Sequence, residues 1–168
     1  MTHPLWPAIA ILAFVTLQRL TELPIAAANT KRLLANGGHE VGASHYPLIV
    51  AVHAAWLATL WWFAPGKPIN LAFFGLFVLI EIGRIWVLRT LGPRWTTRII
   101  VVPGETLVAT GPYRFVNHPN YLVVIAEIAV LPLVFGLWQV ALIFSLLNAT
   151  VLAVRISTEN AALRRLRA

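Results

Sequence analysis

Apolar residues lie in long runs along this chain, and short clusters of polar residues, glycine and proline separate the runs. A helix needs about 20 mostly apolar residues to cross the hydrocarbon core of a bilayer. Three runs reach that length, at residues 5–28, 46–64 and 69–91, and the last two end at Pro65-Gly66-Lys67-Pro68 and at Gly92-Pro93. The pattern therefore predicts three membrane-spanning helices in the first part of the chain.

Two shorter apolar runs follow, at residues 121–136 and 137–154, and they meet at Phe135-Gly136-Leu137-Trp138. Because each run is short and the first contains Pro132, they favour a tight helical hairpin over one long helix. The tail at 155–168 mixes charged residues, mostly arginine, with alanine and leucine. Such a mixture is typical of a short amphipathic helix at the cytoplasmic interface.

These elements predict an all-α integral membrane protein with about five transmembrane helices, the last two as a tight hairpin, and a short cytoplasmic C-terminal helix. We expect one membrane-embedded domain over residues 1–168, with a three-helix part at 1–91 and a second part at 92–168. The composition supports this class, because 59% of the residues are hydrophobic and only 11% are charged. Soluble domains average about half apolar and about 25% charged residues.

The segments between the apolar runs carry two weaker signals. The β-branched stretch 94–102 and the stretch 106–110 flank a Pro103-Gly104-Glu105 turn, which predicts a small β-hairpin. The segment 36–43 contains three glycines and is expected to be a flexible cytoplasmic loop.

The net charge of +7 follows the predicted topology. Only Lys67 lies on one side, and the following basic residues lie on the other: Lys31, Arg32, Arg89, Arg94, Arg98, Arg114, Arg155, Arg164, Arg165 and Arg167. By the positive-inside rule this places the N-terminus outside and the C-terminus in the cytoplasm, in a bacterial inner or plasma membrane. The rule explains the charge without a nucleic-acid partner, and no obligate protein partner is indicated. The chain has no cysteine, which excludes disulfides, thiolate metal ligands and a cysteine nucleophile.

A dense polar and aromatic cluster, Gly111-Pro112-Tyr113-Arg114-Phe115-Val116-Asn117-His118-Pro119-Asn120-Tyr121, lies where the chain must meet the membrane surface. Pro119 suits the first turn of the fourth helix, which leaves the region of His118 and Asn120 at a helix N-terminus that faces anions. A second polar group, Arg155-Ile156-Ser157-Thr158-Glu159, follows the fifth run.

The first cluster resembles the G-P-Y-R-x-x-x-H-P-x-Y signature of the isoprenylcysteine carboxyl methyltransferase family, and the second resembles that family's later signature. The resemblance implies a membrane methyltransferase that uses S-adenosylmethionine, with residues 92–168 as the cofactor-binding part. It implies cofactor-binding roles for Gly111, Pro112, Tyr113, His118, Pro119, Asn120, Tyr121, Arg155 and Glu159. The candidate catalytic residues are Arg155, Glu159 and His45.

The implied cofactor has four groups that the chain must hold. An aromatic face can hold the adenine or lie against the sulfonium, which matches Tyr113 and Tyr121. An imidazole at a helix start, here that of His118, can take the cofactor carboxylate. A protein carboxylate such as Glu159 can take the ammonium.

Three features depart from the family pattern. Asn117 stands where arginine is frequent, Glu159-Asn160 replaces a frequent Glu-Glu pair, and the chain lacks the longer aromatic and basic tail of the eukaryotic enzymes. That tail carries an arginine implicated in substrate handling, so its role is lost or falls to Arg155, Arg164 or Arg165. A prenylated-protein substrate is therefore disfavoured.

The expected reaction transfers the sulfonium methyl group to an oxygen of a lipophilic substrate that enters from the bilayer. A carboxylate or acidic enol needs only orientation, for which Arg155 is a candidate, whereas a phenol needs a base such as His118 or His45. The compact, bacterial-type branch that the chain resembles includes enzymes that methylate alkylpyrones and phenolic lipids. A polyketide lipid is the first acceptor we consider, followed by a prenylcysteine carboxylate and a phospholipid amine.

Two other functions stay open at this point. Membrane sterol and isoprenoid reductases have similar-looking C-terminal motifs and bind NADPH, although a site for its extra phosphates would be expected to carry more basic residues than Arg114. A non-enzymatic membrane scaffold is the second alternative. Metal binding is not expected, because the histidines offer no convergent ligand spacing.

Charged residues inside the apolar runs are costly and need partners. Glu81 and Arg84 lie three residues apart, which favours a structural ion pair between them, and Arg19 and Glu22 form a similar pair. Glu127 has no partner nearby in sequence. It is either a cross-helix anchor for an arginine or a member of the active site.

Overall fold

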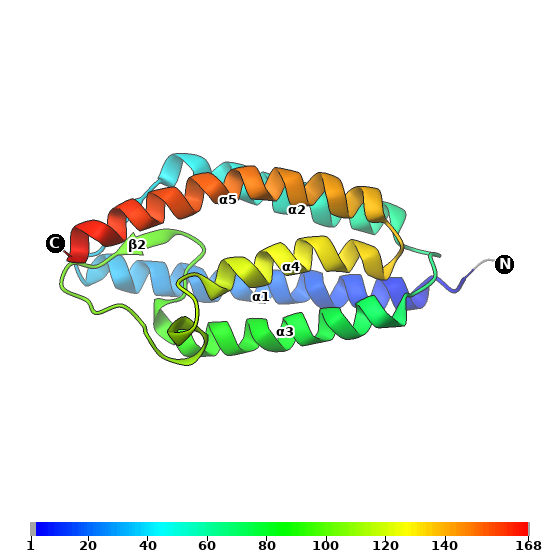
Figure 1. Ribbon diagram of the computed structural model, residues 1–168, viewed down its shortest axis with the longest axis horizontal. Helices are drawn as coiled ribbons and strands as arrows, with labels where there is room; N and C mark the ends of the chain where they lie inside the picture. Colours follow the sequence, from blue (N-terminus) through cyan, green and yellow to red (C-terminus); the bar gives the residue numbers. More distant parts are fainter. Residues whose placement is uncertain (1–2, 168) are drawn as a thin grey trace.

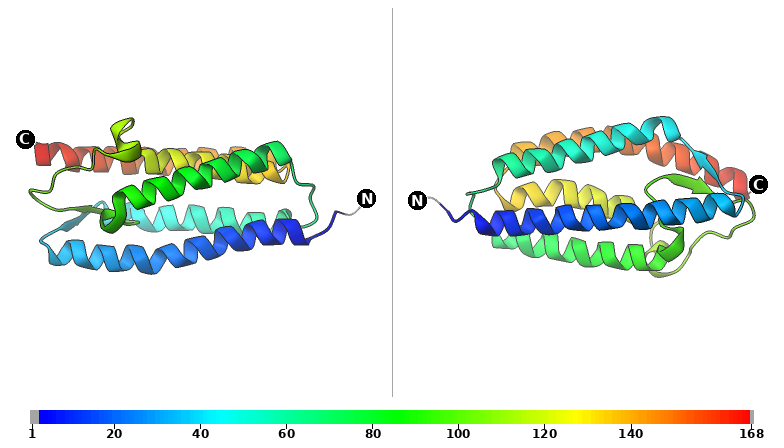
Figure 2. Two further views of the ribbon diagram at one scale, coloured as in Figure 1. Left: turned by 90° about the horizontal axis from the view of Figure 1, so that it is seen from below. Right: turned by 180° about the vertical axis from the view of Figure 1, so that it is seen from behind.

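The computed structural model describes residues 3–167, and side-chain surroundings through residue 164. Five α-helices form an elongated bundle with the two ends of the chain at opposite ends of it (Figures 1 and 2). The helices are α1 (Trp6–Ala35), α2 (Tyr46–Phe63), α3 (Leu71–Leu91), α4 (Pro119–Val134) and α5 (Trp138–Arg167). Two short strands, β1 (His39–Val41) and β2 (Ile99–Val101), and three 3₁₀ turns, η1 (Ala43–His45), η2 (Gly92–Arg94) and η3 (Gly111–Arg114), lie at the end of the bundle that contains the C-terminus.

Local sequence sets where several helices begin and end. Asn70 precedes α3, and its side-chain oxygen accepts hydrogen bonds from the backbone amides of Ala72 and Phe73 at 3.1 and 3.2 Å. Proline stands in the first turn of α1, α2 and α4. At this position a backbone N–H would have no hydrogen-bond partner within the helix, so proline costs nothing there. Gly136, with a φ of 70°, provides the tight connection between α4 and α5.

The helical architecture confirms the predicted class of an all-α integral membrane protein. Helices α1, α2, α3 and α5 are long and apolar enough to cross a bilayer. The 16-residue helix α4 is shorter, and it packs against α3 on one side and α5 on the other. Figure 1 shows α4 between α3 and α5, and Ile128 and Leu131 of α4 are completely buried. Helix α4 therefore contributes to the core.

Two helices run further than the apolar pattern predicts. Helix α5 continues without a break to Arg167, so the prediction of a separate C-terminal helix was wrong. The physical reason is that no glycine or proline follows Leu137, so nothing interrupts the backbone hydrogen bonds where the polar residues begin. Helix α1 likewise passes Ala28 and ends only before the Gly37-Gly38 pair.

The strands also pair differently from the prediction. Strand β2 pairs antiparallel with β1, with Ile100 opposite Glu40, and residues 106–110 form no strand. The segment expected to be a flexible loop thus provides a strand partner for the buried side chains of Ile99 and Val101. Arg98 and Glu40 add an ion pair at 2.8 Å. This pairing joins the chain after α1 to the chain after α3.

A network of buried charges links α1, α3 and α4. The Arg84 guanidinium donates to both carboxylate oxygens of Glu22, at 2.9 and 2.5 Å, and to Glu127 at 2.9 Å. Arg19 reaches the same Glu127 oxygen at 2.6 Å and lies 3.8 Å from Glu22. Glu127 is thus the cross-helix anchor that was one of its two predicted roles, and the Arg19–Glu22 pair is confirmed.

The predicted pair of Glu81 with Arg84 was wrong. Glu81 instead accepts a hydrogen bond at 2.7 Å from Gln18 on α1. Arg84 does not pair with Glu81 because its guanidinium is bound to Glu22 and Glu127 on neighbouring helices. A sequence spacing of three residues identifies a possible pair but does not account for partners on other helices.

We predict that Glu127→Gln destabilises the protein strongly. The substitution leaves the buried guanidinium of Arg84 with less compensation, and breaking a buried ion pair costs roughly 3–5 kcal/mol. Thermal unfolding of the purified protein in detergent would measure the loss. The matched control is Glu105→Gln, which breaks the exposed Arg94–Glu105 pair and should cost under about 1 kcal/mol. Equal losses for the two variants would contradict a central role of the buried network.

Candidate functional site

The first part of the 111–121 cluster is a tight turn fixed against α3. Gly111 begins η3 with a φ of 54°, a conformation that favours glycine. A β-carbon at this position would lie 2.6 Å from the Thr90 hydroxyl oxygen and 3.3 Å from the Trp86 indole nitrogen. Pro112 is buried directly after it. This close approach sets the position of the Tyr113 side chain that follows.

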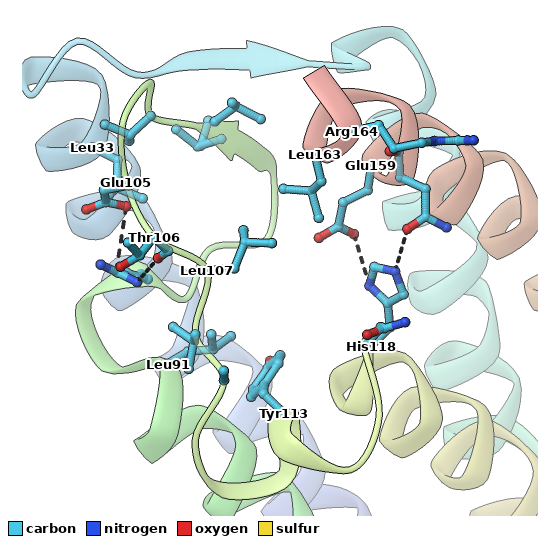
Figure 3. A pocket seen from close by; sticks show the side chains of 18 residues that line it. Leu33, Leu91, Glu105, Thr106, Leu107, Tyr113, His118, Glu159, Leu163 and Arg164 are labelled. Atoms are coloured by element: carbon cyan, nitrogen blue, oxygen red, sulfur yellow. Dashed lines mark hydrogen bonds and ion pairs between the residues drawn. The ribbon is translucent and has the colours of Figure 1, made fainter. Parts of the chain in front are cut away.

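The second part of the cluster meets α5. His118 precedes Pro119, the first residue of α4, and its Nε2 lies 2.9 Å from Oδ1 of Asn160. Because that amide oxygen only accepts, Nε2 carries the proton of this hydrogen bond. The other ring nitrogen, Nδ1, lies 3.7 Å from a carboxylate oxygen of Glu159. Figure 3 shows the imidazole of His118 beneath the Glu159 side chain.

Tyr121, in the first turn of α4, connects the same carboxylate to an arginine. Its hydroxyl donates to Glu159 and accepts a hydrogen bond at 2.9 Å from Nε of Arg155. Arg155 is buried and also donates to the Thr97 backbone oxygen at 2.9 Å. The Tyr121 ring stacks on that of His118, with centroids 5.3 Å apart. The two polar signatures of the sequence therefore meet, through the hydrogen bonds of His118 with Asn160 and of Tyr121 with Glu159 and Arg155.

A cavity of about 610 Å³, here called the outer cavity, lies on one side of this group beneath residues 100–109. Its polar lining includes Tyr113, Asn117, His118, Glu159, Asn160 and Arg164, and its apolar lining includes Leu33, Leu91, Leu107 and Leu163 (Figure 3). Burial, and then the negative charge of Glu159, raise the pKa of the Tyr113 hydroxyl above its ordinary value. Tyr113 thus remains a neutral hydrogen-bond donor.

A second cavity of about 310 Å³, the inner cavity, lies on the other side, among the membrane-spanning helices. Its polar lining includes Arg19, Tyr46, His53, Asn120, Tyr121, Asn148 and Arg155, and its apolar lining includes Ile49, Trp56, Leu57, Val124, Val151 and Leu152. Tyr121 lines the inner cavity and Glu159 lines the outer one. The two cavities adjoin at the hydrogen bond between these residues.

The structure divides the residues singled out from the sequence between these cavities. Tyr113, His118 and Glu159 line the outer cavity, and Asn120, Tyr121 and Arg155 line the inner one. Gly111, Pro112 and Pro119 are absent from both linings and shape the backbone of the turn and the helix start. His45 lines neither cavity, because its ring packs on the Gly42 turn, where a β-carbon would lie 2.2 Å from the ring.

Sequence reasoning missed the cavity positions of several residues. Asn160, noted only as a departure from the family pattern, and Arg164, considered only as a replacement for a missing arginine, both line the outer cavity. His53 and Asn148 line the inner cavity from α2 and α5. The available signal was that both are polar residues within apolar runs, which membrane helices rarely contain without a function. No group of three or more potential metal ligands occurs among the residues that the structure describes.

Comparison with known proteins identifies a family that matches this part of the chain. The model of the isoprenylcysteine carboxyl methyltransferase (ICMT) family matches residues 72–165, which include both signatures. The uncharacterized protein YpbQ of Bacillus subtilis is 37% identical over 167 residues, covering 92% of this chain and 95% of that protein. An uncharacterized protein of Haemophilus influenzae is 29% identical over 156 residues, covering 88% and 90%. No solved structure matches the chain.

We predict that Gly111→Ala destabilises the turn more than two matched glycine substitutions. The alanine would meet both an unfavourable φ and the Thr90 side chain, whereas Gly92→Ala meets only an unfavourable φ of 51° and open space. The conformational cost alone is about 1–2 kcal/mol. Gly83→Ala, in a helix with open space around it, should be neutral or stabilising. Thermal unfolding of the three variants in detergent tests this order, and a Gly111→Ala variant as stable as Gly92→Ala would refute the role of the close approach.

Proposed function

This chain belongs to the isoprenylcysteine carboxyl methyltransferase family, a family of membrane methyltransferases, and we propose that it uses S-adenosylmethionine to methylate an oxygen of a lipophilic acceptor. The outer cavity would hold the cofactor and the inner cavity the acceptor. The observation that carries this proposal is the Tyr121–Glu159 hydrogen bond, at which a water-accessible cavity and a cavity within the membrane helices adjoin.

The outer cavity fits the ammonium end of the cofactor. The Glu159 carboxylate and the Nδ1 atom of His118 lie 3.7 Å apart, and Nε2 of the ring is already engaged with Asn160. When the imidazole is neutral, two hydrogen-bond acceptors thus face each other without a donor between them. An ammonium group supplies donors to both and is held by a charge-assisted hydrogen bond to the carboxylate.

The rest of the cofactor matches the remaining lining. The apolar side chains of Leu91, Leu107 and Leu163 with the Tyr113 ring offer a surface for the adenine, and Arg164 offers a cation for the carboxylate. A volume of about 610 Å³ falls within the range of roughly 300–1,000 Å³ that small-molecule and cofactor sites occupy.

When bound, S-adenosylmethionine would supply an activated methyl group for the acceptor oxygen, with a neutral thioether as the leaving group. The chain's own contribution is to orient the acceptor and exclude water. Arg155 is held in place by the Tyr121 hydroxyl and the Thr97 carbonyl, which directs a fixed positive charge to the junction of the cavities. That charge would attract an acceptor oxygen that arrives already ionised, so that no proton has to be removed during the transfer.

The inner cavity suits a lipophilic acceptor that enters from the bilayer. Its lining extends from Arg155 at the junction to Leu23 on α1 and Val50 on α2, whose side chains are 51% and 48% exposed on the outside of the bundle. Because this outside surface is apolar, an acyl or polyketide chain can remain in lipid while the polar head reaches the junction. A polyketide-derived phenol or enol and an isoprenylcysteine-type carboxylate are the acceptors we propose.

The distribution of charge supports an orientation of the bundle with the outer cavity in the cytoplasm. Arg94, Arg98, Arg114 and Arg164 lie at the end that carries the outer cavity, and Lys67 follows α2 at the opposite end. Basic residues are retained on the cytoplasmic side of membranes. S-adenosylmethionine would thus reach the outer cavity directly from the cytoplasm.

We predict that Glu159→Gln and His118→Ala weaken S-adenosylmethionine binding by roughly 10- to 100-fold, because each removes a partner of the cofactor ammonium. Isothermal titration of the purified, detergent-solubilised protein measures the dissociation constants. The matched controls are Glu40→Gln and His39→Ala on β1, which line neither cavity and should bind like the parent.

Two results of this titration would overturn the proposal. One is unchanged binding of S-adenosylmethionine in both cavity variants. The other is protection of the parent protein from thermal unfolding by NADPH and not by S-adenosylmethionine, which would favour a nicotinamide-dependent reductase.

The orientation is testable by cysteine labelling, because the chain contains no cysteine of its own. Single cysteines at exposed positions, Asn36→Cys after α1 and Lys67→Cys after α2, are compared in intact bacterial cells. We expect a membrane-impermeant thiol reagent to label the cysteine at position 67 alone, and both positions after the cells are opened. The opposite pattern in intact cells would place the outer cavity outside.

A further inference from the structure

Glu81, in the middle of α3, is a buried carboxyl group without a cationic partner among the described residues. It is 6% exposed and belongs to a membrane-spanning segment, where an unpaired charge is costly. The Arg84 guanidinium on the same helix is bound to Glu22 and Glu127 instead. What Glu81 does contact is Gln18 on α1, whose amide nitrogen donates to Oε2 at 2.7 Å. Because an amide is uncharged, this contact does not neutralise a carboxylate.

The charged groups around Glu81 leave one negative charge without compensation. They lie on α1, α3 and α4, and besides Glu81 they are Arg19, Glu22, Arg84 and Glu127. If all five groups were ionised, three carboxylates would share two guanidinium groups. Glu22 and Glu127 both accept charge-assisted hydrogen bonds from Arg84, whereas Glu81 accepts only from the neutral amide. The excess negative charge therefore falls on Glu81.

Two unpaired oxygen atoms of the same contact indicate where a proton can bind. Oε1 of Glu81 and Oε1 of Gln18 are both buried, and neither has a hydrogen-bond partner within the part of the chain that the structure describes. Native proteins seldom leave buried polar atoms unpaired. When Glu81 is ionised, both oxygens can only accept. A proton on Oε1 of Glu81 makes that oxygen a donor, so that the acid and the amide can exchange two hydrogen bonds.

We propose that Glu81 is a proton-binding site in the middle of the bundle, with a proton on Oε1 at neutral pH and with Gln18 as its partner. The bound proton removes the excess charge of the network and satisfies both unpaired oxygens at once. The resulting acid–amide pair joins α3 to α1 without a net charge. Glu22 follows Gln18 by one helical turn and lines the inner cavity. The proton thus helps to hold α1 in place at the wall of that cavity.

Infrared spectroscopy of the purified full-length protein in detergent, at neutral pH, detects the proton directly. The carbonyl stretching band of a carboxylic acid is separate from the bands of a carboxylate. We expect the spectrum of the parent minus that of Glu81→Gln to contain an acid band. The matched control is Glu105→Gln, which changes the exposed Arg94–Glu105 pair and should remove no acid band.

Thermal unfolding in detergent gives a second readout. Glutamine has nearly the shape of a protonated glutamic acid and can also donate and accept, so Glu81→Gln should keep the midpoint within about 3 °C of the parent. Glu127→Gln makes the same substitution at a carboxylate bound by two arginines and should lower the midpoint by roughly 10 °C. Gln18→Leu should lower it by roughly 5 °C and retain the acid band, because it removes only the partner of the acid.

Absence of the acid band, or a loss of stability in Glu81→Gln as large as that in Glu127→Gln, would overturn the inference. The second result would mean that Glu81 is ionised and that a positive charge elsewhere compensates it, for example on His53, which lies near Glu127 and both arginines. A midpoint that rises with sodium chloride in the parent and not in Glu81→Gln would replace the proton by a bound cation. If Glu127→Gln does not fold, the acid band decides. These measurements need no ligand, so their outcome does not depend on the proposed methyl transfer.

Discussion

The buried guanidinium of Arg84 is the interaction on which the arrangement of the bundle depends. It joins Glu22 of α1 to Glu127 of α4 from its own position on α3, and Glu127 is completely buried. Charges at this depth are tolerated only with partners, so the three helices cannot separate or rotate without exposing one of them to an apolar surrounding. The network forms part of the lining of the inner cavity through Arg19, Glu22 and Arg84. The same contacts that fix the helices thus keep a cavity open among them.

The position of α4 determines where both candidate cavities lie. Its first turn carries Tyr121 between the outer and inner cavities, and the residue before it, His118, faces Glu159 on α5. Because α5 continues past the apolar run, Glu159 and Arg155 lie on one rigid helix, one turn apart, rather than on a separate surface helix. The outer and inner cavities therefore adjoin at one hydrogen bond, which is the arrangement on which the proposed methyl transfer relies.

Several features of the fold follow from local physical rules and were predictable. Apolar runs of the length needed to cross a bilayer predicted α1, α2 and α3, and the connection at Gly136 predicted the α4–α5 hairpin. Other features depended on distant partners. The stretch containing Ile99 and Val101 was recognisable as a strand, but its partner β1 lies some 60 residues earlier in the chain. Glu81 and Arg84 share a helix face, yet the arginine is bound by carboxylates from two other helices.

By itself, the sequence determined the membrane class, the helical architecture and the two signatures that carry the family resemblance, because hydrophobicity, helix-breaking residues and motif spacing act locally along the chain. Only the tertiary structure decided that Tyr113 and Tyr121 line different cavities, that His45 lines neither, and that His53 and Asn148 line the inner one. The reason is physical: which side chains share a cavity, and which of their atoms remain unpaired, depends on helix packing and on contacts between residues far apart in sequence.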